Sequence, residues 1–393
     1  MQPLPIMDGI EFVGSVDWDR RLFDSLIPLP DGTSYNAYLV KGRDKVALLD
    51  TVDPIFWDQL REKLRDVPRI DYVVVHHVEQ DHSGSLPLVL EKYPAATVLT
   101  SAKARGMLVD HLHVAEERIR VMADGETIDL GGKTLRFLAM PWVHWPETIV
   151  TYLPEDRVLF SCDLFGSHLA TTDMYVTDEG LVYEAAQRYY AEIMMPFRTV
   201  IKGHLEKLAK LDIAVIAPSH GPLYDRPAFI MDAYRDWVMA PPHNTVVLPF
   251  VSMHGSTEIM VRHLTDALQR QEVRVKPFNL AVTDIGKLAI ALVDAATLIL
   301  GTPTVHLGPH PAAYYAAKLA VALKPKLLYA GLIGSYGWNS RATEQVVELC
   351  QGLKMEILEP VICRGLPLAE DLAALDRLAS VIAGKHRVRQ LTD

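Results

Sequence analysis

Four side chains that commonly bind metal ions lie within six consecutive positions of this 393-residue sequence. They belong to the segment His77-Val78-Glu79-Gln80-Asp81-His82, which directly follows the apolar residues 72–75. A lone aspartate or serine often caps a helix, and Asp81 or Ser83 could cap one that begins near Leu86. Burying several carboxylates and imidazoles together is costly unless a cation neutralises them. The cluster as a whole therefore predicts a metal site.

Three later residues extend this donor set. His144, Asp163 and His220 each lie just past the end of a predicted apolar strand, before residues typical of turns. We expect this repeated placement to bring the donors together at one edge of a sandwich. Oxygen donors mixed with imidazole favour redox-active iron, although zinc accepts the same ligands. The predicted metal ligands are His77, Glu79, Asp81, His82, His144, Asp163 and His220.

The first part of the chain that carries these residues is predicted to be an irregular mixture of short strands and helices. Strands are predicted at 33–40, 46–49, 72–75, 133–139, 148–152, 158–160 and 213–216. A helical region is predicted at 184–211, with a break at Pro196. Consecutive prolines within 239–244 resist helix and sheet and indicate a linker. We therefore expect one domain at 1–240 and another at 245–393.

Strands and helices alternate regularly after this linker. Strands are predicted at 246–250, 273–277, 296–300, 327–332 and 356–361. Helices are predicted at 257–270, 311–323, 341–353 and 368–383. This alternation is typical of a five-stranded, parallel, doubly wound sheet with helices on both faces. Ligands of such sheets bind outside the carboxyl ends of the strands.

Three loops at those carboxyl ends are rich in small residues. The first, Ser252-Met253-His254-Gly255-Ser256-Thr257, precedes a helix whose free N–H groups and positive end favour a phosphate. An ordinary N-cap at Ser256 is the competing interpretation. In the other two loops, small side chains let the backbone approach a bound molecule closely. Their candidate residues are Pro303, Thr304, Val305, His306, Leu307 and Gly308, and then Ser335, Tyr336, Gly337, Trp338 and Asn339.

The composition is that of a folded globular protein, with 49% hydrophobic and 22% charged residues. The formal net charge is −10 and no long basic run occurs, so nucleic acid is not an expected partner. Three widely spaced cysteines predict no disulfide framework. Residues 1–14 lack the pattern of a signal peptide, and the apolar window 288–300 is too short to span a membrane. We expect a soluble protein of the cytoplasm.

Residues 77–82 resemble the H-x-E-x-D-H loop of the flavodiiron proteins, a branch of the metallo-β-lactamase superfamily. Other branches have a histidine at the position of Glu79. The later metal-site residues and the three loops of the second half follow in family order, and residues 31–36 resemble the family's opening segment. The resemblance covers nearly the whole chain. It implies an αββα metallo-β-lactamase-like sandwich followed by a flavodoxin-like domain that binds FMN.

The resemblance also implies two iron ions. One iron would be held by His77, Glu79 and His144, the other by Asp81, His82 and His220, with Asp163 between them. Tyr336 or Trp338 would lie against the isoalloxazine ring of FMN. His76 falls outside the spacing of the motif and is interpreted as a neighbour. Asp50 resembles an acid found beside such sites, or it caps the following turn.

The activity that the resemblance implies is reduction of dioxygen to water, of nitric oxide to nitrous oxide, or of both. A ferrous pair and reduced FMN each supply two electrons, which together match the four-electron reduction of dioxygen. Because flavin and metals would sit on separate domains, the family implies a head-to-tail homodimer or a dimer of dimers. Electrons would come from a rubredoxin, a similar carrier or a reduced deazaflavin.

Two other functions stay open on the sequence. A dizinc hydrolase with an appended flavodoxin domain would use the same ligand types. A non-catalytic flavin electron carrier would retain a vestigial metal site. The complete ligand set argues against the carrier, and Glu79 argues against the hydrolase.

Overall fold

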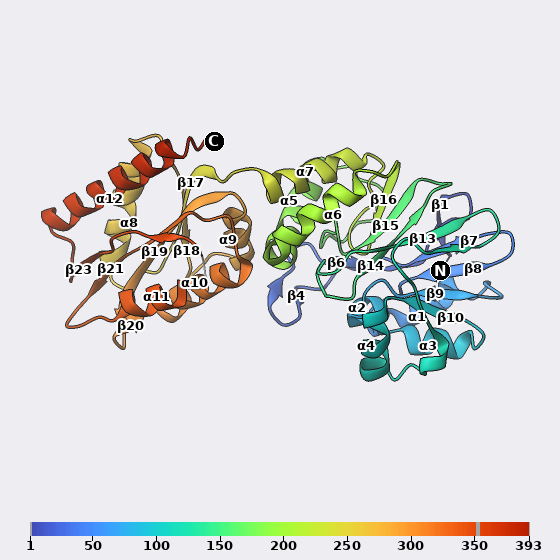
Figure 1. Ribbon diagram of the computed structural model, residues 1–393. Helices are drawn as coiled ribbons and strands as arrows, with labels where there is room; N and C mark the ends of the chain where they lie inside the picture. Colours follow the sequence, from blue (N-terminus) through green and yellow to red (C-terminus); the bar gives the residue numbers. More distant parts are fainter. Residues whose placement is uncertain (1, 351–353, 393) are drawn as a thin grey trace. The chain divides into compact units, whose positions relative to one another are not determined.

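The computed structural model describes residues 2–350 and 354–392, and its chain folds into two compact units (Figure 1). The first unit extends to Tyr190 and includes Phe197–Val238; Ala191–Pro196 group with the second unit, from Met239 onward. The predicted linker at 239–244 therefore begins where the second unit begins, although β17 already starts at His243.

Two mixed sheets form the centre of the first unit (Figure 1). The first sheet has the order β1-β2-β7-β8-β9-β10-β11, at Leu4–Met7, Ile10–Phe12, Tyr38–Lys41, Val46–Leu49, Tyr72–Val74, Thr97–Thr100 and Ile119–Val121. The second has the order β12 to β16, at Thr127–Asp129, Thr134–Ala139, Ile149–Leu153, Val158–Cys162 and Val215–Pro218. Two small ribbons pair β3 (Ser15–Asp17) with β6 (Thr33–Tyr35), and β4 (Leu22–Phe23) with β5 (Ile27–Pro28).

Helices cover the outer face of each sheet. One apolar core joins the first sheet to α1, α3 and α4, and a second core lies between the sheets, with Tyr38 facing Phe160. Figure 1 shows α1 to α4 on one side and α5 to α7 on the other. This arrangement confirms the αββα sandwich. The α-helices are α1 Trp57–Lys63, α2 Gln80–Ser83, α3 Leu86–Lys92, α4 Ala102–Leu112, α5 Glu179–Tyr189, α6 Arg198–Leu208 and α7 Pro227–Met239.

Several predicted elements of the first unit differ in their bounds. The strand predicted at 33–40 is interrupted between β6 and β7, because the Asn36 side chain donates to the carbonyls of Pro218 and Gly221. The strand predicted at 213–216 lies two residues later, as β16. The helix predicted to start at 184 starts at Glu179 instead, where Asp178 accepts from the backbone of Leu181.

The predicted break at Pro196 is confirmed. A π-helical turn at Tyr190–Met194 and a 3-10 turn at Met195–Phe197 separate α5 from α6. Proline offers no N–H to an α-helical ladder, so the chain leaves regular helix here.

The second unit is a parallel sheet in the order β18-β17-β19-β21-β22, with helices on both faces (Figure 1). One face carries α8 and α12, which pack on each other; on the other, α10 packs against α9 and α11. This confirms the flavodoxin-like doubly wound sheet. Its strands are β17 His243–Phe250, β18 Arg274–Asn279, β19 Ala295–Val305, β20 Gly308–Pro309, β21 Tyr329–Tyr336, β22 Glu356–Ile357 and β23 Val361–Arg364. Its helices are α8 Ser256–Gln269, α9 Ile285–Leu292, α10 Pro311–Leu323, α11 Ala342–Cys350 and α12 Ala369–Val388.

The predicted ends of two strands in this sheet are wrong. β19 and β21 continue past residues 300 and 332 as a parallel pair, with Thr302 opposite Gly334 and Pro303 opposite Ser335. The strand predicted at 356–361 is split into β22 and β23 around Pro360, which has no N–H for a ladder. The helix α9 was not predicted. The predicted end of the helix at 341–353 lies in part outside the described residues.

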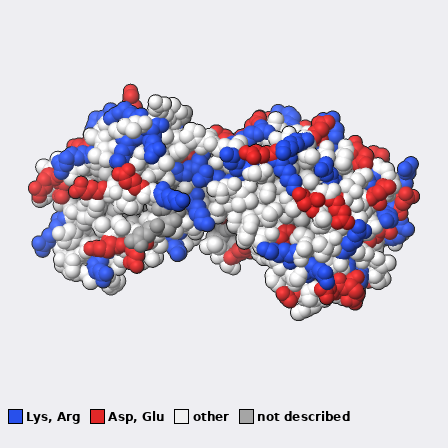
Figure 2. Space-filling view, in the orientation of Figure 1, with Lys and Arg blue, Asp and Glu red and all other residues white. Residues whose placement is uncertain are grey.

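Charged side chains are distributed over both units. Figure 2 shows Lys and Arg interspersed with Asp and Glu across the visible face. Among residues 2–350 and 354–392, no helix is both long and apolar enough to cross a membrane.

Candidate functional site

The seven predicted metal ligands come together at the carboxyl ends of parallel strands in the first unit. His77 follows β9, Asp163 follows β15 and His220 follows β16. His144 lies in the loop after β13, whereas Asp81 and His82 lie on the short helix α2 rather than in a loop. Five of the seven are buried, and Glu79 and His144 are partly exposed.

The donor atoms form two groups, and within each group they lie within 4.8 Å of one another. The first group contains His77, Glu79, His144 and Asp163, and the second contains Asp81, His82 and His220. Apart from Asp163, which the resemblance places between the two irons, these are the two ligand sets that the resemblance assigns to one iron each.

Asp163 lies between the two groups. Its Oδ2 is 3.6 Å from Nε2 of His77 and 3.4 Å from Nε2 of His144. Its Oδ1 is 3.1 Å from Nε2 of His82 and 3.3 Å from Nε2 of His220. One carboxylate oxygen therefore faces each group, as a carboxylate bridging two cations requires.

Several buried polar atoms of the cluster lack hydrogen-bond partners among the described residues. They include both carboxylate oxygens of Asp81, both of Asp163 and Nε2 of His82. The short distances between them thus do not reflect aligned hydrogen bonds. Unsatisfied buried carboxylates are costly, and a bound cation satisfies them. The residues present fit a site for two metal ions.

Neighbouring groups orient two of the imidazoles with Nε2 toward this cluster. Nδ1 of His220 donates to the Ser34 carbonyl at 2.6 Å, because a carbonyl oxygen only accepts. Nδ1 of His77 lies 2.7 Å from Oε1 of the buried Glu147, which also accepts from the backbone of Val78. Each neutral ring then offers the Nε2 lone pair to a metal.

The electrostatics of the cluster show how strongly it favours positive charge. Burial alone would lower the pKa of His144, but the carboxylates of Asp163 and Glu79 raise it to about 10. Burial would also lower the pKa of His220, but Asp163 and Asp81 raise it to about 9. The same pairs hold the pKa of Asp163 well below its usual range against its burial. Cations that replace these protons satisfy the same carboxylates.

Three residues beside this site were missed by sequence reasoning. Glu147 orients His77 from 70 positions away in the chain. Asp24 lies beside Glu79, and burial and the Glu79 charge raise the pKa of its carboxyl group. The ring of His168 lies 5.0 Å from that of His220. Each stands apart from the metal-binding motif in the sequence, so no local pattern distinguished them.

The two other sequence interpretations near the motif are resolved by hydrogen bonds. The Asp50 carboxylate holds His76 at two points: Oδ1 accepts from the His76 backbone N–H at 2.9 Å, and Oδ2 lies 2.6 Å from Nδ1 of the ring. The other ring nitrogen, Nε2, lies 2.8 Å from Oγ1 of Thr151. Asp50 is thus no turn cap; Asp53 caps the following 3-10 turn. The capping alternative for Asp81 or Ser83 is also wrong, because Ser85 is the N-cap of α3.

A cavity of about 500 Å³ lies at the carboxyl ends of β17, β19 and β21 in the second unit. All three predicted loops contribute to it. A fourth segment, at Gly365 and Leu366, was not predicted. The predicted residues that line it are Ser252, Met253, His254, Ser256, Thr257, Pro303, Thr304, Ser335, Tyr336, Gly337 and Trp338.

The start of α8 is arranged to bind an anion. Ser252 Oγ accepts from the backbone N–H groups of Gly255 and Glu258, both at 3.2 Å. Gly255 is the N-cap with φ of +90°, a conformation that suits glycine, so the predicted N-cap at Ser256 is wrong. Within the described chain the buried Thr257 Oγ1 has no hydrogen-bond partner. This hydroxyl and the free N–H groups of the helix fit a flavin phosphate.

Six predicted residues are not in the lining of this cavity, namely Gly255, Val305, His306, Leu307, Gly308 and Asn339. β19 turns through His306 and Leu307, both with positive φ, into a hairpin with β20. Val305, His306 and Gly308 therefore line a separate hollow beside Tyr314 and Tyr315. Leu307 and Asn339 are exposed, and Asn339 Oδ1 accepts from the backbone of Ser340.

Comparison with known proteins identifies relatives of the whole chain. A family model described as ODP family beta lactamase matches residues 33–221. The chain is 35% identical to the nitric oxide reductase of Moorella thermoacetica, over 98% of this chain and 99% of that protein. It is 30% identical to the rubredoxin-oxygen oxidoreductase of Megalodesulfovibrio gigas, over 98% of both chains.

Solved structures agree. The rubredoxin oxygen:oxidoreductase from Desulfovibrio gigas matches with a TM-score of 0.94 and 29% identity, over 99% of this chain and 100% of that one. The flavodiiron protein from Giardia intestinalis matches with a TM-score of 0.90 and 26% identity, over 98% of each chain. On these matches, together with the two grouped donor sets, the chain is an oxidoreductase that belongs to the flavodiiron protein family.

Proposed function

We propose that the protein reduces dioxygen to water, nitric oxide to nitrous oxide, or both, at a pair of irons in the first unit. The observation that carries the proposal is the position of Asp163, whose two carboxylate oxygens face two separate groups of donors. Relatives named nitric oxide reductase and rubredoxin-oxygen oxidoreductase align over 98% of this chain and support it.

The cofactors we propose are two iron ions and one FMN per chain. His77, Glu79 and His144 would hold one iron, Asp81, His82 and His220 the other, and Asp163 would bridge them. Residues 252–257, 303–304 and 335–338 would hold FMN. The irons and the flavin supply the electrons for the reaction. We propose functional domains at 1–240 and 245–393.

The protein's own residues have three tasks in this scheme. Three carboxylates would offset most of the charge of two divalent cations, and four neutral imidazoles would supply further ligands. Glu147 and the Ser34 carbonyl hold His77 and His220 with Nε2 inward. Burial excludes water from the side of Asp163, which is 0% exposed, while Glu79 and His144 are partly exposed and leave a route for a small gas.

Electrons would come from an external carrier such as rubredoxin or a reduced deazaflavin. Relatives named for rubredoxin and for coenzyme F420H(2) support either donor. We propose a head-to-tail homodimer, or a dimer of dimers, in which the flavin of one subunit serves the irons of the other. We also propose that the protein works in the cytoplasm.

Turnover of the protein, reduced beforehand in the absence of both gases, tests the proposed function. The purified protein is reduced with excess donor, supplied with dioxygen or nitric oxide in separate experiments, and the products are measured. We expect consumption of at least one gas, with water rather than peroxide as the product from dioxygen and nitrous oxide from nitric oxide. Hydrolytic activity that needs no reductant, without consumption of either gas, would support a dizinc hydrolase and contradict the proposal.

A further inference from the structure

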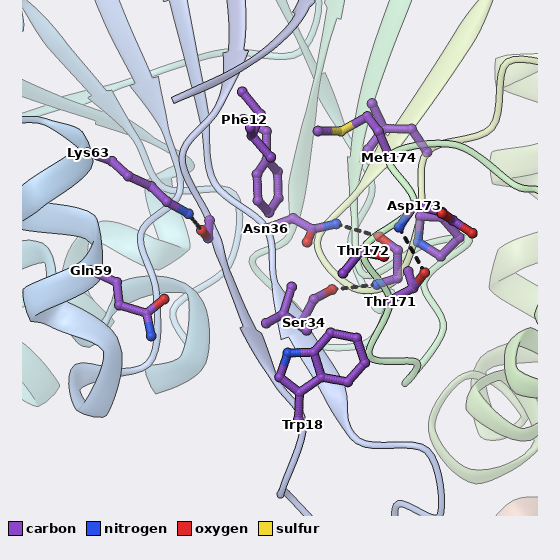
Figure 3. Close-up of a pocket in the computed structure, with 16 residues that line it drawn as sticks. Phe12, Trp18, Ser34, Asn36, Gln59, Lys63, Thr171, Thr172, Asp173 and Met174 are labelled. Carbon is purple, nitrogen blue, oxygen red and sulfur yellow. Dashed lines mark hydrogen bonds between the residues drawn. The ribbon is translucent and has the colours of Figure 1, made fainter. Parts of the chain in front are cut away.

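A cavity of about 390 Å³ lies in the first unit beside the metal cluster and takes no part in the proposed reaction. Figure 3 shows Phe12, Trp18 and Met174 around it, with Lys63 entering from the last turn of α1. Leu223 and Val16 add further apolar surface. Trp18 belongs to the lining and is 52% exposed, so this part of the lining is accessible to a solute.

Two charged side chains line this cavity, the buried Lys63 and the exposed Asp173. Lys63 is only 9% exposed. Its Nζ donates to the Gly14 carbonyl and lies 5.2 Å from the centre of the Phe12 ring. An ammonium group has three N–H donors, so a hydrogen bond to one carbonyl leaves two of them free to bind another acceptor. Among the described residues no carboxylate forms an ion pair with Lys63, and burial lowers its pKa to about 8. A buried cation without a counter-charge is costly.

The other polar groups of the cavity do not supply that counter-charge. Asp173, at the far side in Figure 3, accepts from the Thr177 hydroxyl. Asn36 uses its amide N–H groups on the carbonyls of Pro218 and Gly221. The cavity thus combines an apolar body with one buried positive charge that has no ion-pair partner among the described residues.

We propose that this cavity binds a small amphipathic carboxylate. Its carboxylate group accepts hydrogen bonds from Lys63 Nζ, and its apolar body packs against Phe12 and Trp18. Charge complementarity selects the carboxylate, because a neutral or cationic molecule of the same shape leaves Lys63 uncompensated or repels it.

The position of the cavity gives an occupant a connection to the metal cluster. Ser34 and Gly221 line the cavity, and the Ser34 hydroxyl accepts from the Gly221 backbone at 2.8 Å. The Ser34 carbonyl accepts from Nδ1 of His220, whose Nε2 lies 3.2 Å from Asp81. An occupant of the cavity therefore contacts Ser34, the residue whose carbonyl orients His220.

The test is titration of the full-length protein with sodium octanoate, followed by calorimetry and by tryptophan fluorescence. We expect saturable binding at one site per chain and a fluorescence change that Trp18→Phe removes. Octanol and octylamine carry the same chain without the negative charge, and we expect each to bind at least tenfold more weakly. Equal binding of octanol, or no saturable binding of octanoate, would overturn the proposal.

Two lysine variants separate binding from folding. Lys63→Met fills similar space without charge, and we expect at least tenfold weaker octanoate binding with an unchanged or higher melting temperature. Lys103→Met is the matched control, since Lys103 is exposed and lies 5.7 Å from the Trp142 ring, away from the cavity. Octanoate should bind this control as it binds the parent protein. Unchanged octanoate affinity in Lys63→Met, whatever its melting temperature, would also overturn the proposal.

Discussion

The histidines of the metal cluster and His386 of the second unit have pKa values shifted in opposite directions. In the first unit, carboxylates overcome burial and raise the pKa of His144 to about 10 and of His220 to about 9. In the second unit, burial lowers the pKa of His386 to about 4. The ring nitrogens of His386 lie against neutral partners, Thr297 at Nε2 and Asn244 at Nδ1. The metal cluster thus gathers charge for an ion, whereas the hydrogen-bond partners of His386 are neutral.

The difference extends to the two candidate sites. The metal cluster consists of side-chain donors, whose buried carboxylates need cations. The cavity at the carboxyl ends of β17, β19 and β21, which we call the flavin cavity, is lined by small residues, hydroxyls and the N–H groups at the start of α8. A multivalent ion is recognised by charge, and a phosphate with a planar ring by shape and hydrogen-bond donors. Changes in one site should therefore leave the ligand of the other site in place.

The largest expected effect comes from Asp163→Asn. An amide keeps the shape but loses the charge that faces both donor groups, so we expect about a 100-fold or greater loss of gas reduction. The FMN content should be unchanged. Asp110→Asn, at an exposed position of α4, is the matched control and should keep full activity. Loss of FMN with retained metal in Asp163→Asn would break the division into two independent sites.

A smaller effect is expected from Glu147→Gln. The glutamine still accepts from His77, but without a negative charge it weakens the basicity of the Nε2 lone pair. We expect about tenfold lower metal affinity, measured by competition with a chelator, since partners of metal ligands contribute about 10- to 100-fold. An unchanged affinity would show that Glu147 only fills space.

The flavin site is tested with Thr257→Val, which keeps the shape of the side chain and removes the unpartnered hydroxyl. A hydrogen bond to a charged phosphate contributes about 1.5–3 kcal/mol, so we expect FMN to bind at least about tenfold more weakly. Metal content should not change. Thr265→Val is the matched control, because Thr265 also lies on α8 with no hydrogen-bond partner among the described residues, but outside the cavity. Equal FMN affinity in both variants would remove Thr257 from the phosphate site.

The smallest effect concerns pH. Because the pKa of His386 is lowered in the folded state, the unfolded chain binds more protons between about pH 6.5 and 4. Stability of the second unit should therefore fall as pH decreases through this window, by on the order of 2 kcal/mol. This loss of stability is measured by flavin fluorescence, because FMN is released when the second unit unfolds. His386→Gln should flatten this dependence, and an unchanged slope would place the titrating group elsewhere.

The metal cluster could be predicted from the sequence because its donors are unusual side chains at fixed positions. Residues 77–82 alone bring together four of them, and the later three follow strand ends that the apolar pattern indicates. Glu147 could not be predicted in this way. Its partner His77 lies 70 residues earlier, and only the folded sandwich brings the two together.

The flavin cavity was harder to predict because backbone conformation builds it. Gly301 and Gly308 suggested one loop, but pairing with β21 extends β19 to Val305, and a tight hairpin then directs residues 305–308 away from the cavity. Gly365 and Leu366 reach the cavity because the last strand is split around Pro360. Neither effect is visible in the types of the residues alone.

In our proposal the first unit holds redox-active iron and the second holds FMN. The decisive measurement is the metal and flavin content of the full-length protein, purified after expression with both iron and zinc available. We expect about two irons and one FMN per chain, with little zinc. Stoichiometric zinc with negligible iron would contradict it, even if FMN were fully bound.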